Sequence, residues 1–203
     1  MLHASRYTLE ERGLHSAQMV MIGAGDPVAM LNQAAECRRL SVPYALDPSF
    51  QVARFSGEEM IEHFPGATYV FCNEYESAIV QNKTGWSLDA FKAQVETLVV
   101  TLAEKGSVIY TDFGNGEEIF IPPAQPTIVV HPTGAGDAYR GGFFAARLKG
   151  LPLEISGRVG SLAATYAIEY SGPMDHSYTL DEFMARYEEN FGREPALERL
   201  KNE

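Results

Sequence analysis

The chain has 203 residues, of which 45% are hydrophobic, and it carries a formal net charge of −11. Its length and apolar content favour one globular domain with a sizeable core, and the acidic balance argues against a nucleic acid or an anionic membrane as partner. The sequence shows no signal-peptide pattern and no apolar run long enough to span a bilayer, so we expect a cytoplasmic protein.

A strand over 19–22 and a helix over 27–40 are the first predicted elements. Between them stands the tetrapeptide Gly23-Ala24-Gly25-Asp26, followed by a proline. Because proline suits the first position of a helix, Asp26 is interpreted as the N-cap residue of this helix. The apolar spacing predicts the buried face of the helix, which is formed by Val28, Leu31, Ala35 and Leu40.

Short apolar runs over 44–46 and 68–72 predict the next two strands. Asn73 and Glu76 follow the second of these strands, at the end where the ligands of open parallel sheets gather. The same pair also matches a capping box, in which Asn73 caps a helix and Glu76 stands at its third position. Both interpretations remain open. The two cysteines, Cys37 and Cys72, lack metal or redox spacing and are expected to be buried.

The apolar spacing over 87–105 predicts a long helix capped by its first serine. Two strands over 108–111 and 117–121 then flank Asn115-Gly116, a dipeptide typical of tight hairpins. A β-branched run over 127–130 predicts one more strand. Strands that alternate with helices favour a largely parallel, doubly wound α/β sheet flanked by helices.

The most informative stretch is Pro132-Thr133-Gly134-Ala135-Gly136-Asp137, which leads into a helix that reaches Lys149. The amides of the Gly-Ala-Gly segment would lack helical acceptors and point out of the helix N-terminus. With the helix dipole they predict an anion site, suited to a phosphate or a phosphoryl transition state. Asp137 beside this site could take a proton from an attacking hydroxyl. The pattern indicates phosphoryl transfer; the alternative is a tight connection with an ordinary first-turn acid.

This Thr133–Asp137 segment, its helix and the upstream Asn73-x-x-Glu76 pattern resemble the signature of the ribokinase-like (PfkB) carbohydrate and nucleoside kinases. The later Ile168-Glu169-Tyr170-Ser171-Gly172 segment and His176 are most similar to the bacterial adenosine-kinase-like branch. The resemblance implies an ATP-dependent phosphotransferase that acts on a hydroxyl of a nucleoside, adenosine first, or of a sugar. Its fold would be a ribokinase-like α/β sheet.

The resemblance also implies a role for each matching residue. Asp137 would be the general base, and Gly134, Ala135 and Gly136 would form the anion hole for the transferred phosphoryl group. Asn73 and Glu76 would organise Mg²⁺, mainly through water, and the nucleotide phosphates. The other residues expected at the nucleotide are Thr111, Gly116, Thr133 and His176. Arg140, three residues after the base, could reach substrate or phosphate or pair with a glutamate.

One α/β domain over 1–203 is expected, with a polar lead-in over 1–18 and the kinase-like part over 19–192. Within that part, Thr179 and Glu182 predict a capping box for a last helix. The charged tail over 193–203 is expected to fray.

Three features depart from the family pattern. His131 stands where the family usually has an Asp that helps to hold a monovalent cation, which argues against activation by such a cation. Phe113 replaces the first glycine of the family's nucleotide-binding Thr-x-Gly-x-x-Gly pattern. The chain is also short, because the family's N-terminal strands, its Gly-Gly element and its β lid have no counterpart. We therefore keep as alternative a truncated or degenerate kinase that binds nucleotide without turnover.

A small-molecule substrate and ATP are the expected partners, together with a homodimer that covers an exposed sheet edge. A Rossmann oxidoreductase is disfavoured, since no Gly-x-Gly-x-x-Gly follows a strand with an acidic residue at the proper distance.

Overall fold

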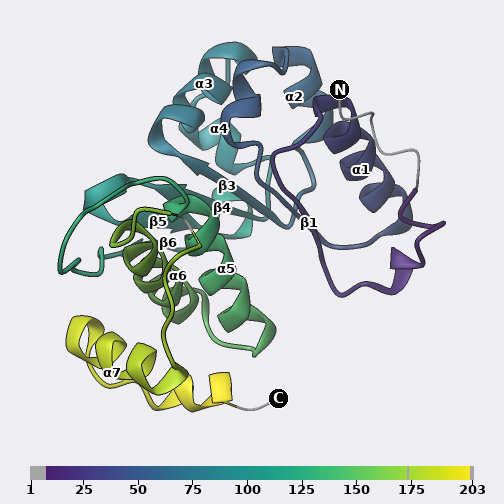
Figure 1. The fold of residues 1–203 in the computed structure, drawn as a ribbon. Helices are drawn as coiled ribbons and strands as arrows, with labels where there is room; N and C mark the ends of the chain where they lie inside the picture. Colours follow the sequence, from purple (N-terminus) through teal and green to yellow (C-terminus); the bar gives the residue numbers. More distant parts are fainter. Residues whose placement is uncertain (1–7, 173, 202–203) are drawn as a thin grey trace. The chain divides into compact units, whose positions relative to one another are not determined.

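The computed structural model describes residues 8–172 and 174–201. The chain divides into two compact units (Figure 1), one formed by residues 1–101 and 109–118 and the other by residues 102–108 and 119–203. We call these unit 1 and unit 2. The expectation of one domain over 1–203 stays a prediction.

Six strands form one sheet in which the spatial order follows the chain. They are β1 (Val20–Ile22), β2 (Tyr44–Leu46), β3 (Tyr69–Asn73), β4 (Thr97–Thr101), β5 (Ser107–Tyr110) and β6 (Glu118–Ile121). β1 to β4 pair in parallel, with Val20 opposite Tyr44, Leu46 opposite Val70, and Phe71 opposite Val99. The connections to β5 and β6 are too short for a parallel crossover and are therefore hairpins. This arrangement confirms the predicted, largely parallel α/β sheet.

Unit 1 holds four helices around β1 to β4. They are α1 (Pro27–Leu40), α2 (Gly57–His63), α3 (Glu74–Thr84) and α4 (Leu88–Lys92), with short 3₁₀ helices at Leu14–Ser16, Ser49–Ala53 and Asp112–Gly114. α1 packs against β1 and β2, and α3 packs against β3 and β4. Asp26 caps α1 as predicted, because its carboxylate accepts a hydrogen bond of 3.0 Å from the Ala29 amide. The predicted buried face of α1 was wrong at Val28, which is 57% exposed, while Leu31, Ala35 and Leu40 are half-buried. The residues that the helix buries are Met30, Ala34 and Cys37.

Unit 2 holds a second core and the remaining helices. These helices are α5 (Ala135–Leu148), α6 (Leu153–Ile168) and α7 (Leu180–Phe191), with 3₁₀ helices at Ala103–Lys105 and Pro195–Lys201. α5 and α6 pack along each other (Figure 1). The predicted capping box of Thr179 and Glu182 is present at α7. The expected fraying of 193–203 was wrong for the part that the structure describes, because Leu197 is buried in the same core as Leu151 and Tyr187.

Two predicted elements were wrong. The expected helix over 87–105 is only α4, since residues 97–101 form β4 and are buried or half-buried along the whole strand. A fully buried β-branched strand has no alternation that distinguishes it from a buried helix. The expected strand over 127–130 is irregular backbone, and Ile128, Val129 and Val130 are exposed. These residues have the composition of a strand, but none of the strands in the described part of the chain pairs with them.

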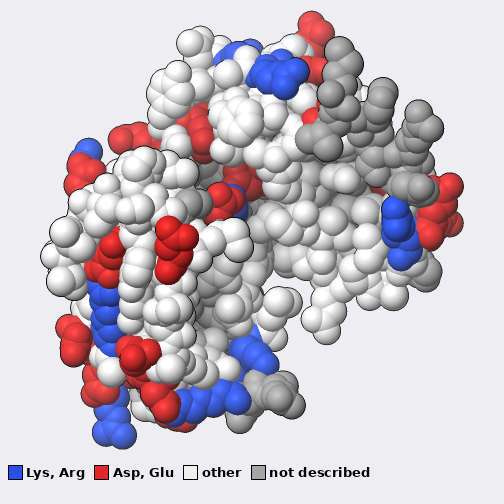
Figure 2. Space-filling model, viewed as in Figure 1, with Lys and Arg blue, Asp and Glu red and all other residues white. Residues whose placement is uncertain are grey.

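Acidic and basic side chains are interspersed on the face of the molecule that Figure 2 shows, and no continuous basic patch is visible there. Among the described residues, no helix is both long enough and apolar enough to cross a membrane.

Candidate active site

The glycine turn before α5 exposes backbone amides at the start of the helix. Gly134 is the N-cap residue and takes a left-handed conformation with φ 89°, which glycine adopts at no steric cost. Its carbonyl accepts a hydrogen bond of 2.9 Å from the Ala138 amide, and the Ala135 amide makes a long contact of 3.4 Å with the Pro132 carbonyl. Among the described residues, no backbone carbonyl accepts from the Gly136 or Asp137 amides. The start of α5 therefore presents donors and the positive end of the helix dipole.

Asp137 is the third residue of α5, and 82% of its side chain is exposed. Its carboxylate accepts a hydrogen bond from Arg140, one turn later on the same helix. Sequence reasoning left open whether Arg140 would reach a ligand or pair with a glutamate, and in the structure it pairs with Asp137. The acid and the free amides thus lie in the same helical turn, with a guanidinium beside them.

His131 supports the turn from the preceding segment. Its Nδ1 accepts a hydrogen bond of 3.2 Å from the amide of Thr133, the residue before Gly134. Because the amide is the donor, Nδ1 is the acceptor of this hydrogen bond. His131 therefore stabilises the chain just before Gly134 through a ring nitrogen.

Asn73 and Glu76 lie in unit 1, where β3 leads into α3. The Asn73 side chain accepts from the Glu76 amide at 2.8 Å, and the Glu76 carboxylate accepts from the Asn73 amide at 2.8 Å. This is the capping box that the sequence left open. The box engages one carboxylate oxygen, Oε2, and within the described part of the chain no donor reaches the other, Oε1. A hydrated Mg²⁺ usually takes only one or two protein carboxylates, so Glu76 with this free oxygen fits such an ion.

The predicted nucleotide loop over 111–116 also lies in unit 1. Gly116 approaches Thr111 so closely that a Cβ at this position would lie 2.3 Å from Oγ1 of Thr111. The same hydroxyl accepts from the Glu117 amide at 2.7 Å. Two predicted strands flank the loop, but Asn115-Gly116 does not make the tight turn, because the left-handed residues are Asp112, Phe113 and Gly114. Phe113 adopts φ 53°, a conformation that glycine adopts far more readily.

His176 lies in unit 2, in the connection between α6 and α7. Its ring contacts are with Tyr170 and Tyr178, at centroid distances of 6.4 and 6.0 Å. In the part of the chain that the structure describes, no hydrogen bond joins His176 to the glycine turn. The other predicted site residues form three groups: the turn with Asp137 and Arg140, the capping box of Asn73 and Glu76, and the 111–116 loop.

A metal site built from several side chains needs its ligands close together. Within residues 8–172 and 174–201, no three His, Cys, Asp or Glu side chains lie together as a metal site would require. Burial raises the pKa of the Tyr139 hydroxyl strongly, although a hydrogen bond of 2.7 Å with Ser107 opposes this. Tyr139 therefore stays protonated and anchors the buried side of α5.

Comparison with known proteins identifies the family. Residues 3–179 match the model of the pfkB family of carbohydrate kinases. The chain is 32% identical over 175 residues to a nucleoside kinase of Methanocaldococcus jannaschii, an alignment that covers 86% of this chain and 57% of that protein. The structure of the nucleoside kinase of Burkholderia thailandensis in complex with inosine superposes with a TM-score of 0.83 at 32% identity. That superposition covers 88% of this chain and 57% of the other.

The chain belongs to the pfkB family of carbohydrate kinases. A second relative that is named a nucleoside kinase, from Methanothermobacter thermautotrophicus, is 28% identical over 91% of this chain. The chain spans little more than half the length of these relatives, with 57% and 58% covered.

Proposed function

We propose that this chain carries the catalytic part of an ATP-dependent kinase that phosphorylates a hydroxyl of a nucleoside or a sugar. The observation that carries the proposal is the first turn of α5, where the exposed Asp137 carboxylate stands beside amides without backbone acceptors. An acid next to an anion site is the arrangement that transfer of a phosphoryl group to an alcohol requires.

In the proposed reaction Asp137 accepts the proton of the acceptor hydroxyl. The hydroxyl oxygen attacks the γ-phosphorus of ATP, a new O–P bond forms, and the bond from the γ-phosphorus to the bridging oxygen breaks, so that ADP leaves. Gly134, Ala135 and Gly136 donate their amides to the charge that develops on the phosphoryl oxygens. Thr133 fixes the direction of this turn through its bond to His131.

ATP reaches such enzymes with Mg²⁺, which neutralises phosphate charge when it is bound. We propose that Glu76, through its Oε1 and intervening water, and Asn73 hold the metal–nucleotide complex at the end of β3. Thr111, Gly116 and His176 are the further residues that we assign to the nucleotide. His131 in place of an acid offers no carboxylate to a monovalent cation, so we expect no activation by potassium.

The acceptor that we place first is a purine nucleoside such as adenosine, with a sugar as the second choice. This order rests on two supports: relatives of this chain are named nucleoside kinases, and the Burkholderia thailandensis protein is described in complex with inosine. The resemblance of the segment over 168–172 to the adenosine-kinase-like branch adds to it.

A specific observation favours a second function, a degenerate kinase that binds nucleotide without turnover. Phe113 occupies a left-handed position where the family has glycine. This feature would weaken the nucleotide site more than the glycine turn itself.

We also propose that a second copy of the chain covers exposed apolar side chains in unit 2. β6 lies at one edge of the sheet and exposes Phe120, and Ile128, Val129 and Val130 are exposed just beyond it in the chain. Exposed edges and contiguous apolar residues are commonly buried by association.

The test is phosphoryl transfer from MgATP to a panel of nucleosides and sugars, with Asp137→Asn compared with Asp26→Asn. Both acids end a Gly-Ala-Gly-Asp tetrapeptide, and asparagine preserves the N-cap of α1. Loss of the general base should lower kcat by about 10²- to 10⁴-fold, whereas Asp26→Asn should leave turnover unchanged. Equal activity in wild type and Asp137→Asn would contradict the role of Asp137. Binding of MgATP by the wild type without turnover of any acceptor would favour the second function.

A further inference from the structure

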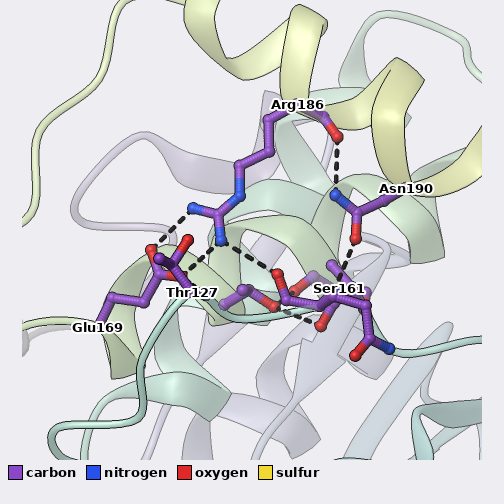
Figure 3. Close-up of polar contacts among 8 residues, drawn as sticks. Thr127, Ser161, Glu169, Arg186 and Asn190 are labelled. Carbon is purple, nitrogen blue, oxygen red and sulfur yellow. Dashed lines mark hydrogen bonds and ion pairs between the residues drawn. The ribbon is translucent and has the colours of Figure 1, made fainter.

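The segment over 122–131, which leads from β6 to the glycine turn, is held mainly by side chains (Figure 3). No strand among residues 8–172 and 174–201 pairs with it, yet several of its amides and carbonyls are hydrogen-bonded to residues of α6 and α7 and to Glu169. The contacts that fix this segment also fix the position of Gly134, because only Pro132 and Thr133 lie between them.

The first part of the segment is bound by buried hydroxyls of α6. Ser161 accepts from the Ala124 amide at 2.9 Å and donates to the Pro122 carbonyl at 3.2 Å. Thr165, one turn later, donates to the Ala124 carbonyl at 3.2 Å. These bonds dock the beginning of the segment on α6.

The middle of the segment is bound by α7. The Asn190 side chain accepts from the Gln125 amide at 2.7 Å and donates to the Arg186 carbonyl at 2.8 Å. Arg186 donates to the Gln125 carbonyl at 3.2 Å. In Figure 3, Arg186 and Asn190 point down from α7 toward the segment. Both hydrogen-bonding groups of the Gln125 backbone are thus engaged by α7.

Glu169, the residue that ends α6, joins these contacts. Its carboxylate accepts from the Thr127 amide at 2.6 Å and pairs with both terminal nitrogens of Arg186, at 2.7 and 2.5 Å. The side chains of Arg186 and Glu169 are only 15% and 9% exposed. Burial alone would raise the pKa of Glu169, but the hydrogen bonds from Arg186 and Thr127 lower it overall. The carboxylate is therefore held in its charged form.

The end of the segment is bound next to the same residue. The Val130 and His131 amides donate to the Ile168 carbonyl at 2.8 and 3.1 Å. Ile168 and Glu169 are consecutive, so the C-terminal end of α6 holds the chain from Thr127 to His131 at two points.

We propose that Glu169 and Arg186 are positioning residues for the glycine turn. Neither belongs to the turn, and both act through the segment over 122–131, whose placement sets the direction in which the amides of α5 point. α7 thereby contributes to the anion site through this pair. The proposal rests on the proposed kinase function for its effect on turnover, but its structural part is independent of that function.

The test compares Glu169→Gln and Arg186→Gln with Glu154→Gln. Glu154 lies at the other end of α6 and pairs with Arg158, so the control makes the same chemical change in a more exposed ion pair of the same helix. The first readout is amide hydrogen exchange over 122–137, measured on the whole chain by mass spectrometry. We expect faster exchange in this region in both variants, unchanged exchange within α6, and no change in the control. Arg186→Lys keeps one charged contact and should restore protection in part.

The second readout separates kcat from KM in phosphoryl transfer. Misplaced amides should lower kcat by about 10- to 100-fold, with KM for the acceptor changed less than about twofold. Asn190→Ala removes the bond to the Gln125 amide and the bond to the Arg186 carbonyl but leaves the ion pair of Glu169 and Arg186 in place. It should give a smaller effect, and it is the variant to use if the charged variants do not fold. Unchanged exchange over 122–137 in soluble variants would overturn the proposal, as would acceleration spread equally over α5 and α6. Faster local exchange in a protein without kinase activity would support the positioning role and contradict only the proposed reaction.

Discussion

Arg140 pairs with Asp137 across one turn of α5, and its guanidinium also lies beside Gly136, the residue before the acid. A Cβ at position 136 would lie 3.3 Å from a terminal nitrogen of Arg140. The arginine side chain is 18% exposed, whereas that of the aspartate is 82% exposed. The absence of a side chain at Gly136 therefore leaves room for the Arg140 guanidinium at the start of a helix whose first amides lack backbone acceptors.

Arg140 should contribute to the binding of a phosphorylated ligand at this turn. Arg140→Gln removes the cation, and the loss of one charge-assisted contact should raise KM for MgATP by about tenfold. Arg140→Lys preserves the charge and should give a smaller increase. Steady-state kinetics over a range of ATP concentrations give KM and kcat for both variants. A fall in kcat with KM unchanged would show that Arg140 only orients Asp137.

Gly142 should be required for the packing of α5 on α6, whereas its neighbour Gly141 should not be. A Cβ at Gly142 would lie 2.8 Å from Cβ of Ala163 and 2.9 Å from the carbonyl oxygen of Val159; a Cβ at Gly141 would meet nothing within 4 Å. Gly142→Ala should lower the free energy of unfolding by about 1–3 kcal/mol. Gly141→Ala should raise it by about 0.5–1 kcal/mol, since alanine favours the helix.

Urea unfolding followed by far-UV circular dichroism measures both changes. The pair is its own control, because the two substitutions are identical and adjacent in the same helix. A stabilised Gly142→Ala variant would mean that α5 and α6 lie farther apart than the structure places them.

Cys37 should be chemically inert in the folded protein and should make unit 1 sensitive to alkali. Burial, aided by Glu36, raises the pKa of its thiol from 9.0 to about 11. The favourable contribution of the neutral thiol is complete below pH 9.0 and is lost as the pH rises through about 11. At pH 8 a thiol reagent should label Cys37 and Cys72 slowly in the native protein and rapidly in urea. Cys37→Ala should reduce the loss of stability between pH 9 and 11; equal losses would contradict the assignment.

The exposed run of Ile128, Val129 and Val130 should promote self-association. Val129→Thr keeps a β-branched shape but adds a hydroxyl, and should shift the association to higher concentration. Val28→Thr is the matched control, because Val28 on α1 is 57% exposed and Val129 is 62% exposed. Sedimentation velocity over a concentration series tests both variants. A wild-type chain that stays monomeric throughout would refute the proposed dimer.

Local hydrogen-bond patterns were the features that the sequence predicted best. The caps at Asp26, Ser87 and Thr179 form as expected. The capping box of Asn73 and Glu76, one of the two interpretations that the sequence left open, forms as well. Each depends on residues three positions apart, so a short window of sequence contains the whole interaction. The glycine turn before α5 was also predictable, because it too depends on a few consecutive residues.

Features that depend on distant residues could not be predicted in this way. The segment over 97–101 pairs with β3, and that partner, rather than its apolar spacing, makes it a strand. The run over 127–130 has strand composition, but its amides at 127 and 130 bond to the end of α6 instead. Glu169 was noticed only as part of a family resemblance. Its link to Arg186 joins two helices, and no spacing in the sequence reveals it.

The two copies of Gly-Ala-Gly-Asp show that the same four letters have opposite local chemistry at two places in one chain. Asp26 stands just outside its helix and closes it with its own carboxylate. Asp137 stands three positions further into its helix, where the backbone of Gly134 has already made the turn and the acid is left to face solvent. The position of an acid relative to the first helical residue thus decides whether it caps its own helix or stays exposed to solvent. A sequence pattern that includes this position would distinguish Asp137 from Asp26.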